Sequence, residues 1–112
     1  MIDSYRFGEF VIQGKTFKSN VILIDNTFKE ARHLENHELK IDDFTELINS
    51  NPSYIIIGTG AYGVVKPQKE IIDIIESKGI KLVIEKTADA CRKYNEFLKQ
   101  GIKVAAFLHN TC

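Results

Sequence analysis

The chain has 112 residues, a length typical of one domain and sufficient to bury a hydrophobic core without disulfides or metal ions. Its hydrophobic fraction of 44% and charged fraction of 27% are those of a globular protein, which argues against disorder. Fifteen basic residues balance 15 acidic ones. A chain without net positive charge is poorly suited to sequence-independent nucleic-acid binding or to an anionic membrane surface, so we expect neither partner.

Targeting signals and membrane spans are not evident in the sequence. Residues 1–6 have neither the basic and apolar regions of a signal peptide nor the Arg-rich pattern of a transit peptide. The longest apolar runs, near 21–24 and 54–57, have the length of strands. Cys91 and Cys112 are expected to be free thiols. We therefore predict a cytoplasmic protein with no membrane insertion.

Strands are predicted for much of the first 40 residues. Hydrophobic alternation over 6–12 predicts a strand, residues 13–15 form a plausible turn, and the chain returns from Thr16. The apolar run 21–24 predicts a buried strand. The stretch 28–39 has mixed charges and no clean period, so we expect irregular structure there with room for one short strand.

A helix is predicted over 43–50. Asp43 and Glu46 have the spacing of a capping box, in which side chains satisfy the free backbone N–H groups at a helix start. Asn51-Pro52 ends the helix, because a proline disfavours helical backbone in the residue before it. Three apolar residues at i, i+3 and i+4 spacing would face the core: Phe44, Leu47 and Ile48.

Strands and helices alternate strictly in the second half. Pro67 is a good first helical residue, and glycines are suitable helix stops. A β-α-β-α-β order implies three parallel strands joined by right-handed crossovers, with the N-terminal strands extending or covering that sheet. The sequence therefore predicts an α/β fold in a single domain, 1–112. The predicted elements are strands over 54–57, 81–85 and 104–108 and helices over 67–78 and 87–100.

The segment Gly58–Gly63 matches the dinucleotide fingerprint G-x-G-x-x-G and follows a predicted strand. In that fingerprint the helix starts inside the glycine run, so that its N–H groups face the pyrophosphate. Here Val64 and Val65, both β-branched, follow the last glycine, and the helix is predicted to start only at Pro67. The chain also has only one βαβαβ unit, whereas the usual dinucleotide-binding crevice is formed by two. We therefore interpret the segment as a wide loop and predict no cofactor.

The carboxyl ends of parallel strands form the edge where α/β sheets bind ligands. The three predicted strands deliver the residues that follow them to one such edge, together with the N-terminus of the helix that begins near 87. Arg92 lies about one turn into that helix and could lean toward the same edge. A helix N-terminus beside an arginine suits a small anion. The candidate ligand-binding residues are Thr59, Gly60, Thr87, Arg92, His109 and Cys112.

Simpler structural roles also explain several of these residues. Thr87 has a suitable side chain for an N-cap. Cys91 falls on the apolar face of its helix and is interpreted as an inert core thiol. His109 and Cys112 could serve as base and nucleophile, but no acidic group is evident to orient the imidazole, so we predict no catalytic residue. The three histidines and two cysteines also lack the spacing of metal ligands, and we predict no metal.

Five ordered segments resemble one family of small domains. They are Phe7-Gly8, His37, Ile57–Gly60, Thr87–Asn95 and Val104–Cys112. The family contains archaeal and bacterial proteins of unknown function, the adipogenesis-associated domain protein of animals, and the mitochondrial complex I assembly factor three. The resemblance covers essentially the whole chain, which is similar to a minimal prokaryotic member and lacks the mitochondrial targeting extension.

The resemblance implies a three-layer α/β fold with a mixed central sheet and additional N-terminal β structure. No catalytic activity is established for the family, and its mitochondrial members act as non-enzymatic assembly factors by binding other proteins. We therefore expect a non-catalytic binding or assembly-type protein with an unidentified protein partner. The alternative is a small-molecule binding protein, or an enzyme, that takes an anionic ligand at the strand-end edge. An exposed apolar patch favours the first reading, and an enclosed polar pocket favours the second.

Overall fold

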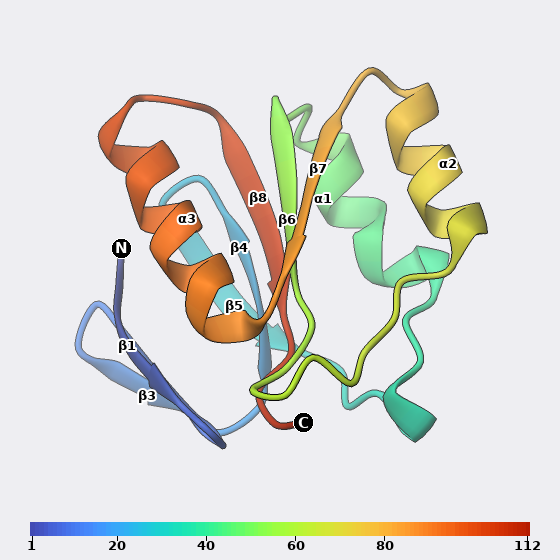
Figure 1. The fold of residues 1–112 in the computed structure, drawn as a ribbon. Helices are drawn as coiled ribbons and strands as arrows, with labels where there is room; N and C mark the ends of the chain where they lie inside the picture. The colour runs from blue at the N-terminus through green and yellow to red at the C-terminus, as the bar shows by residue number, and fades with distance from the viewer.

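A five-stranded mixed sheet forms the middle layer of the computed structural model, which describes residues 1–112 (Figure 1). The strands are ordered β5-β4-β8-β6-β7 across the sheet. The three strands of the second half are parallel, whereas β4 is antiparallel to β8 and β5 is antiparallel to β4. The strand bounds are β4 (Asn20–Ile24), β5 (Thr27–Ala31), β6 (Tyr54–Gly58), β7 (Lys81–Glu85) and β8 (Val104–Leu108).

The predicted β-α-β-α-β unit is confirmed. Its strands lie side by side in parallel, and the connecting helices are α2 (Lys69–Ser77) and α3 (Thr87–Lys99). The prediction for the start of α2 was wrong by two residues, because Pro67 precedes the helix and Gln68 is its N-cap. Buried parallel strands have nearly continuous apolar sequences, and for this reason the strands of the second half could be predicted from the sequence.

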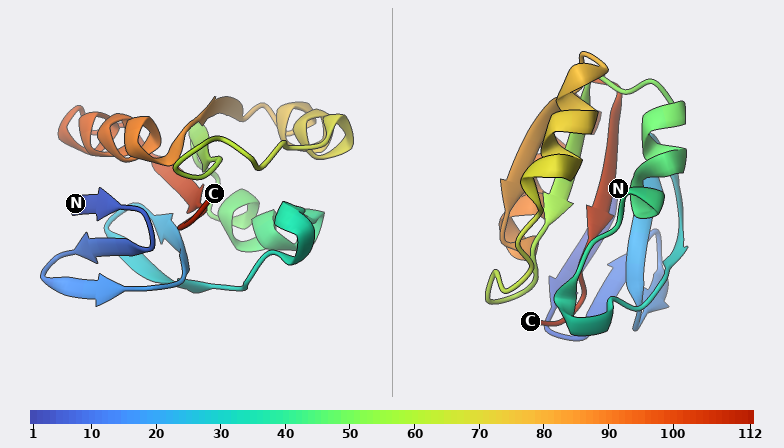
Figure 2. Two further views of the ribbon diagram at one scale, coloured as in Figure 1. Left: turned by 60° about the horizontal axis from the view of Figure 1, so that its bottom comes forward. Right: turned by 90° about the vertical axis from the view of Figure 1, so that its right-hand side faces the viewer.

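The two faces of the sheet are covered by different layers, as Figure 2 shows from below and from the side. One face packs against α2 and the short helix α1 (Thr45–Asn49), around a core that includes Ile57, Ile75 and Phe107. The other face packs against α3 and a small antiparallel sheet, around a core that includes Phe10 and Tyr94. The small sheet consists of β1 (Ile2–Arg6), β2 (Glu9–Ile12) and β3 (Lys15–Phe17). The three layers and the mixed sheet match the architecture implied by the family resemblance.

The prediction of one strand over 6–12 was wrong. The alternation over 6–12 is not one strand, because β1 ends at Arg6 and a tight turn at Phe7-Gly8 starts the antiparallel return. Gly8 has φ +85°, a conformation that glycine adopts at no steric cost. The stretch 28–39 holds one short strand, β5, as expected, followed by irregular chain with a 3-10 turn at Glu35–His37.

The predicted helix over 43–50 is divided into a 3-10 helix, Ile41–Phe44, and α1. The capping interaction lies earlier than expected, because the Asp43 carboxylate accepts the backbone N–H of Lys40 at 2.7 Å. Glu46 instead pairs with Lys29 of β5. None of the helices combines the length and the apolar composition that a membrane crossing requires.

Candidate functional site

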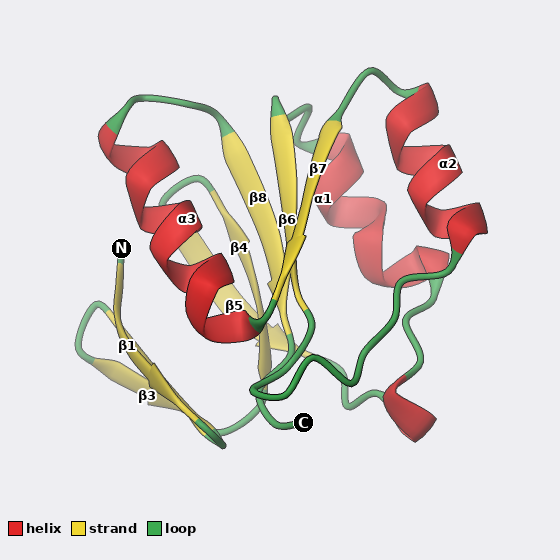
Figure 3. Cartoon of the chain, in the orientation of Figure 1, coloured by secondary structure: helices red, strands yellow, loops and turns green.

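The strand ends of β6 and β8 meet at one edge of the sheet. The backbone N–H of His109 donates to the carbonyl of Gly58 at 3.0 Å, so the pairing continues one step past β8. Further along, Ala61 N–H donates to Thr111 C=O at 2.7 Å and Val64 N–H donates to Cys112 C=O at 2.9 Å. Figure 3 shows the loop after β6 and the C-terminal residues at the same end of the molecule. The strand-end edge expected from parallel topology therefore exists.

Thr87 occupies the centre of this edge as an internal connector. Its hydroxyl accepts the backbone N–H of Gly60 at 2.8 Å and donates to the carbonyl of His109 at 2.8 Å. The side chain is 0% exposed. The expectation that Thr87 is an N-cap was wrong: the N-cap is Lys86, and no side chain caps α3. Thr59 is used in a similar way, since its hydroxyl donates to Glu85 C=O at 3.1 Å.

Gly60 lets two chain segments approach unusually closely. It has φ +105°, and a Cβ placed on it would lie 2.1 Å from the carbonyl carbon of Cys112. The residue therefore has to be glycine for packing, independent of any ligand. The glycine loop does not open a helix, because α2 starts only at Lys69. This geometry differs from a dinucleotide site, where the glycines precede the helix directly.

Arg92 is not brought to the strand-end edge. Its guanidinium pairs with Asp89 on the same helix, and its side chain is largely exposed. It lines a hollow of about 170 Å³ between α3 and β1, where Cys91 and Asn95 also lie. Cys112 is half-buried at the edge, with its carbonyl bonded to the glycine loop. Among the candidate residues, the structure thus gathers Thr59, Gly60, Thr87, His109 and Cys112, and separates Arg92 from them.

His109 has partners that sequence reasoning missed. Its Nδ1 lies 3.0 Å from Oδ1 of Asn20 on β4, and its Nε2 lies 3.4 Å from Nδ1 of His37. The imidazole is 3% exposed. Burial, with smaller contributions from His37 and His33, lowers the pKa of His109 to about 4. The ring therefore stays neutral near neutral pH and is oriented by an amide rather than by a carboxylate.

The thiol of Cys91 is inert by environment. The residue is buried in the core beneath α3. Burial raises the pKa of the thiol to about 12, and the thiolate is the reactive form of cysteine. A nucleophilic role for this side chain is therefore disfavoured.

Apolar side chains collect on the outside of the same edge and form what we call the aromatic surface: Phe7, Tyr62, Val64 and Ile84. These residues are 52%, 70%, 45% and 39% exposed, and only Met1 is a comparable exposed apolar residue elsewhere. The rings of Phe7 and Tyr62 lie 5.8 Å apart between centroids. A bond from Gly8 N–H to Asn110 C=O, 3.2 Å, holds the β1–β2 turn against the end of β8. Tyr62 and Ile84 also line a shallow groove of about 290 Å³.

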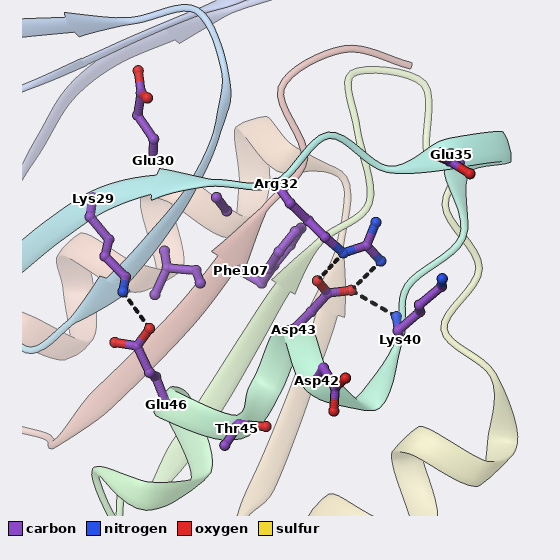
Figure 4. Close-up of a pocket in the computed structure, with 12 residues that line it drawn as sticks. Lys29, Glu30, Arg32, Glu35, Lys40, Asp42, Asp43, Thr45, Glu46 and Phe107 are labelled. Atoms are coloured by element: carbon purple, nitrogen blue, oxygen red, sulfur yellow. Dashed lines mark hydrogen bonds and ion pairs between the residues drawn. The ribbon is translucent and has the colours of Figure 1, made fainter.

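The largest hollow lies elsewhere, between β5 and α1 (Figure 4), with a volume of about 560 Å³. Two ion pairs cross it: Arg32 to Asp43 at 2.6 Å, and Lys29 to Glu46. Phe107 lies beneath them at the floor. The two pairs tie β5 to the segment that ends in α1. No exposed large apolar side chain lies in the hollow. The other charged residues of the lining form no ion pair, but three of the four are acidic: Glu30, Glu35, Lys40 and Asp42.

The chain is thus a small three-layer α/β domain, and backbone and hydroxyl groups close the carboxyl ends of its parallel strands. The chain belongs to the family described as Protein of unknown function (DUF498/DUF598), which matches residues 2–109. This membership confirms the resemblance drawn from the sequence motifs.

Solved structures of similar proteins share the fold. A conserved hypothetical protein from Pyrococcus horikoshii is 21% identical, with a TM-score of 0.88 over 100% of this chain and 99% of that chain. A protein from Bartonella henselae described as an outer membrane protein is 21% identical, with a TM-score of 0.86 over 99% and 94% of the two chains. A Mth938-like domain from Bordetella pertussis is 14% identical, with a TM-score of 0.71 over 98% and 85%. At these identities the comparison shows the fold alone.

Proposed function

We propose that this chain is a non-catalytic binding domain of the cytoplasm, with an assembly-type role, and that it binds another protein through the aromatic surface. The observation that carries the proposal is the clustering of four of the five exposed large apolar side chains at one edge. Isolated exposed apolar residues are common, whereas a contiguous apolar group with a polar rim is typical of a protein interface. Aromatic residues are also enriched at such interfaces.

The chemistry of the edge supports binding rather than catalysis. The hydroxyls of Thr59 and Thr87 are engaged in internal hydrogen bonds. The His109 imidazole is buried, and no carboxylate orients it. A nucleophile needs an adjacent base held by a third group, and no such set is formed here. The small-anion alternative is also weakened, because Arg92 lies on another surface.

The charges around the groove favour an acidic partner segment. Lys66, Lys86 and Glu85 line the groove beside Tyr62 and Ile84, which leaves one excess positive charge. Neither lysine takes part in an ion pair within the chain. Rim charges of this kind act mainly on association rate and specificity, while the buried aromatic contacts supply most of the affinity. We therefore expect a segment with acidic residues around one aromatic or aliphatic anchor.

A selection from a random peptide display library tests this proposal. Wild-type protein should enrich acidic sequences with an apolar anchor, and binding should weaken at higher salt. A Tyr62→Ser, Ile84→Ser double variant should lose binding to the enriched peptides. A Lys66→Glu, Lys86→Glu double variant should keep the fold and lose the preference for acidic sequences. A Lys78→Glu, Lys99→Glu double variant makes the same charge change at exposed positions outside the groove, and serves as the matched control.

Three outcomes would overturn the proposal. The first is enrichment of peptides with no acidic bias. The second is binding that survives the Tyr62→Ser, Ile84→Ser change. The third is self-association of the wild-type chain that this change abolishes, because the occupant of the surface would then be a second copy.

A further inference from the structure

The fold gathers three histidines that are far apart in the sequence. His33 and His37 follow β5, and His109 follows β8. His109 lines a hollow of about 240 Å³ together with His33, and His37 contacts the Nε2 side of its ring. The spacing of these residues in the sequence predicted no metal site. Their proximity arises from β4, which lies next to both β5 and β8 in the sheet.

Hydrogen bonds fix which nitrogen of His109 carries the proton. The backbone N–H of Asn110 donates to Asn20 Oδ1 at 2.8 Å, and a backbone N–H can only donate, so this atom of Asn20 is an acceptor. His109 Nδ1 lies 3.0 Å from the same oxygen and must therefore be the protonated nitrogen. In the neutral ring, Nε2 then carries the lone pair. Histidines that bind metal ions are held in this way, with the second nitrogen donating to an oxygen acceptor.

We propose that Nε2 of His109 and Nδ1 of His37 bind a divalent transition-metal ion of the zinc, nickel or copper type. The two nitrogens are 3.4 Å apart, and the rings are nearly perpendicular, at 82°. This separation is long for a hydrogen bond, whose usual N–H···acceptor length is about 2.9–3.0 Å. Two nitrogens bound to one tetrahedral ion at about 2.0–2.1 Å are about 3.4 Å apart. Imidazole is a preferred ligand of these ions.

Two buried polar atoms in the hollow beside His109 lack a hydrogen-bond partner. Asn110 lines the same hollow and is 2% exposed, and its Oδ1 has no hydrogen-bond partner. Its Nδ2 donates to Ser19 C=O at 2.7 Å, which fixes the orientation of the amide. Ser19 Oγ is likewise buried without a partner. Both residues line the hollow that His33 and His109 also line, where water would satisfy such atoms.

The proposed site has two protein ligands as the structure stands. No group of three His, Cys, Asp or Glu side chains is arranged to hold an ion. Water therefore fills the remaining positions, or His33 supplies a third ligand after rotation of its exposed side chain. An ion bound in this way keeps coordination positions that water occupies.

The first experiment is a titration of the purified chain with Zn²⁺ alone, followed by calorimetry and melting temperature. His37→Asn is the informative variant, because His37 has φ +56° and asparagine tolerates that left-handed backbone better than most residues. We expect saturable binding to the wild type and an affinity at least about tenfold weaker in His37→Asn. Loss of a residue that only hydrogen-bonds a metal ligand already weakens metal affinity by about 10–100-fold, and loss of a ligand itself should weaken it more. Adding Zn²⁺ to the ¹⁵N-labelled protein should shift His109 Nε2 and His37 Nδ1, while His109 Nδ1 keeps its proton.

His33→Asn is the matched control for adventitious binding to an exposed histidine. Weakening in both variants, together with the shifts of the His37 and His109 nitrogens, identifies His33 as the third ligand and supports the proposal. Zinc binding that is lost in His33→Asn and unchanged in His37→Asn overturns it, as does the absence of any saturable binding to the wild type. A spectrum in which only His33 nitrogens respond also overturns it, without relying on a variant of the buried His109.

Discussion

Replacing Thr87 by valine should be among the most damaging conservative changes in this protein. The substitution keeps the size of the side chain and removes only the hydroxyl, so no large cavity is formed. Gly60 N–H and His109 C=O would both lose their partner in a fully buried location. Each unsatisfied buried group costs about 1–3 kcal/mol, so the free energy of unfolding should fall by about 2–6 kcal/mol. Such a loss is large against a typical total of about 5–15 kcal/mol.

Urea unfolding of matched variants measures this loss. Thr87→Ser keeps the hydroxyl and removes one methyl group, and should cost about 1 kcal/mol. Thr27→Val removes a hydroxyl that donates to Ile24 C=O at the surface, 2.8 Å, and should change stability by no more than about 0.5 kcal/mol. If Thr87→Val costs less than about 1 kcal/mol, or less than Thr87→Ser, the reasoning that makes this hydroxyl the connector of the strand ends is refuted.

Three further predictions concern the thiols, the ion pairs and the glycine loop. In the native protein, Cys112 should react quickly with a thiol reagent and Cys91 slowly, because burial raises the pKa of the Cys91 thiol to about 12. Equal reaction rates without denaturant would contradict the packing of α3. Asp43→Ala should lower the unfolding free energy by about 2–3 kcal/mol. This is less than the roughly 3–5 kcal/mol lost when a fully buried ion pair is broken, because the Arg32 partner is partly exposed. Glu46→Gln at the surface should cost less than about 1 kcal/mol, and similar losses for the two variants in urea unfolding would show that burial does not distinguish the two pairs. NAD and NADP should leave the melting temperature unchanged, because neither is expected to bind. A cofactor that did bind would raise the free energy of unfolding by about 2.7 kcal/mol at a hundredfold excess over its dissociation constant. A saturable rise in melting temperature would therefore show that the Gly58–Gly63 loop is a nucleotide site.

The parallel half of the fold was predictable because each element carries its own signal. Strands β6 and β8 are continuous apolar runs, and glycines mark the ends of α2 and α3. The N-terminal hairpin was not predictable in the same way. Its turn at Phe7-Gly8 has only two residues, so the hydrophobic alternation of β1 continues into β2 without a break. Alternation with a two-residue period is the same before and after a turn, and therefore does not indicate where the chain reverses.

The candidate site was predicted in part, for reasons of topology. Thr59 and His109 follow neighbouring parallel strands, so their convergence required only the β-α-β order. Asn20 was missed because no sequence pattern shows that β4 pairs with β8 in antiparallel fashion. Arg92 was misplaced because the direction of a side chain depends on the rotation of its helix about its axis, which only packing decides. The aromatic surface joins a hairpin turn, the loop after β6 and the end of β7, and no sequence pattern connects these three segments.

The most direct test of the account is to map where a partner segment binds. The ¹⁵N-labelled protein would be titrated with an acidic peptide taken from the display selection, and amide shifts would be followed residue by residue. The largest shifts should cluster at Phe7-Gly8, Tyr62–Lys66 and Ile84–Lys86, and the residues of the charged hollow between β5 and α1 should not shift. Shifts centred instead on Lys29, Arg32 and Glu46 would contradict the claim that the aromatic surface at the strand-end edge is the binding surface of this protein.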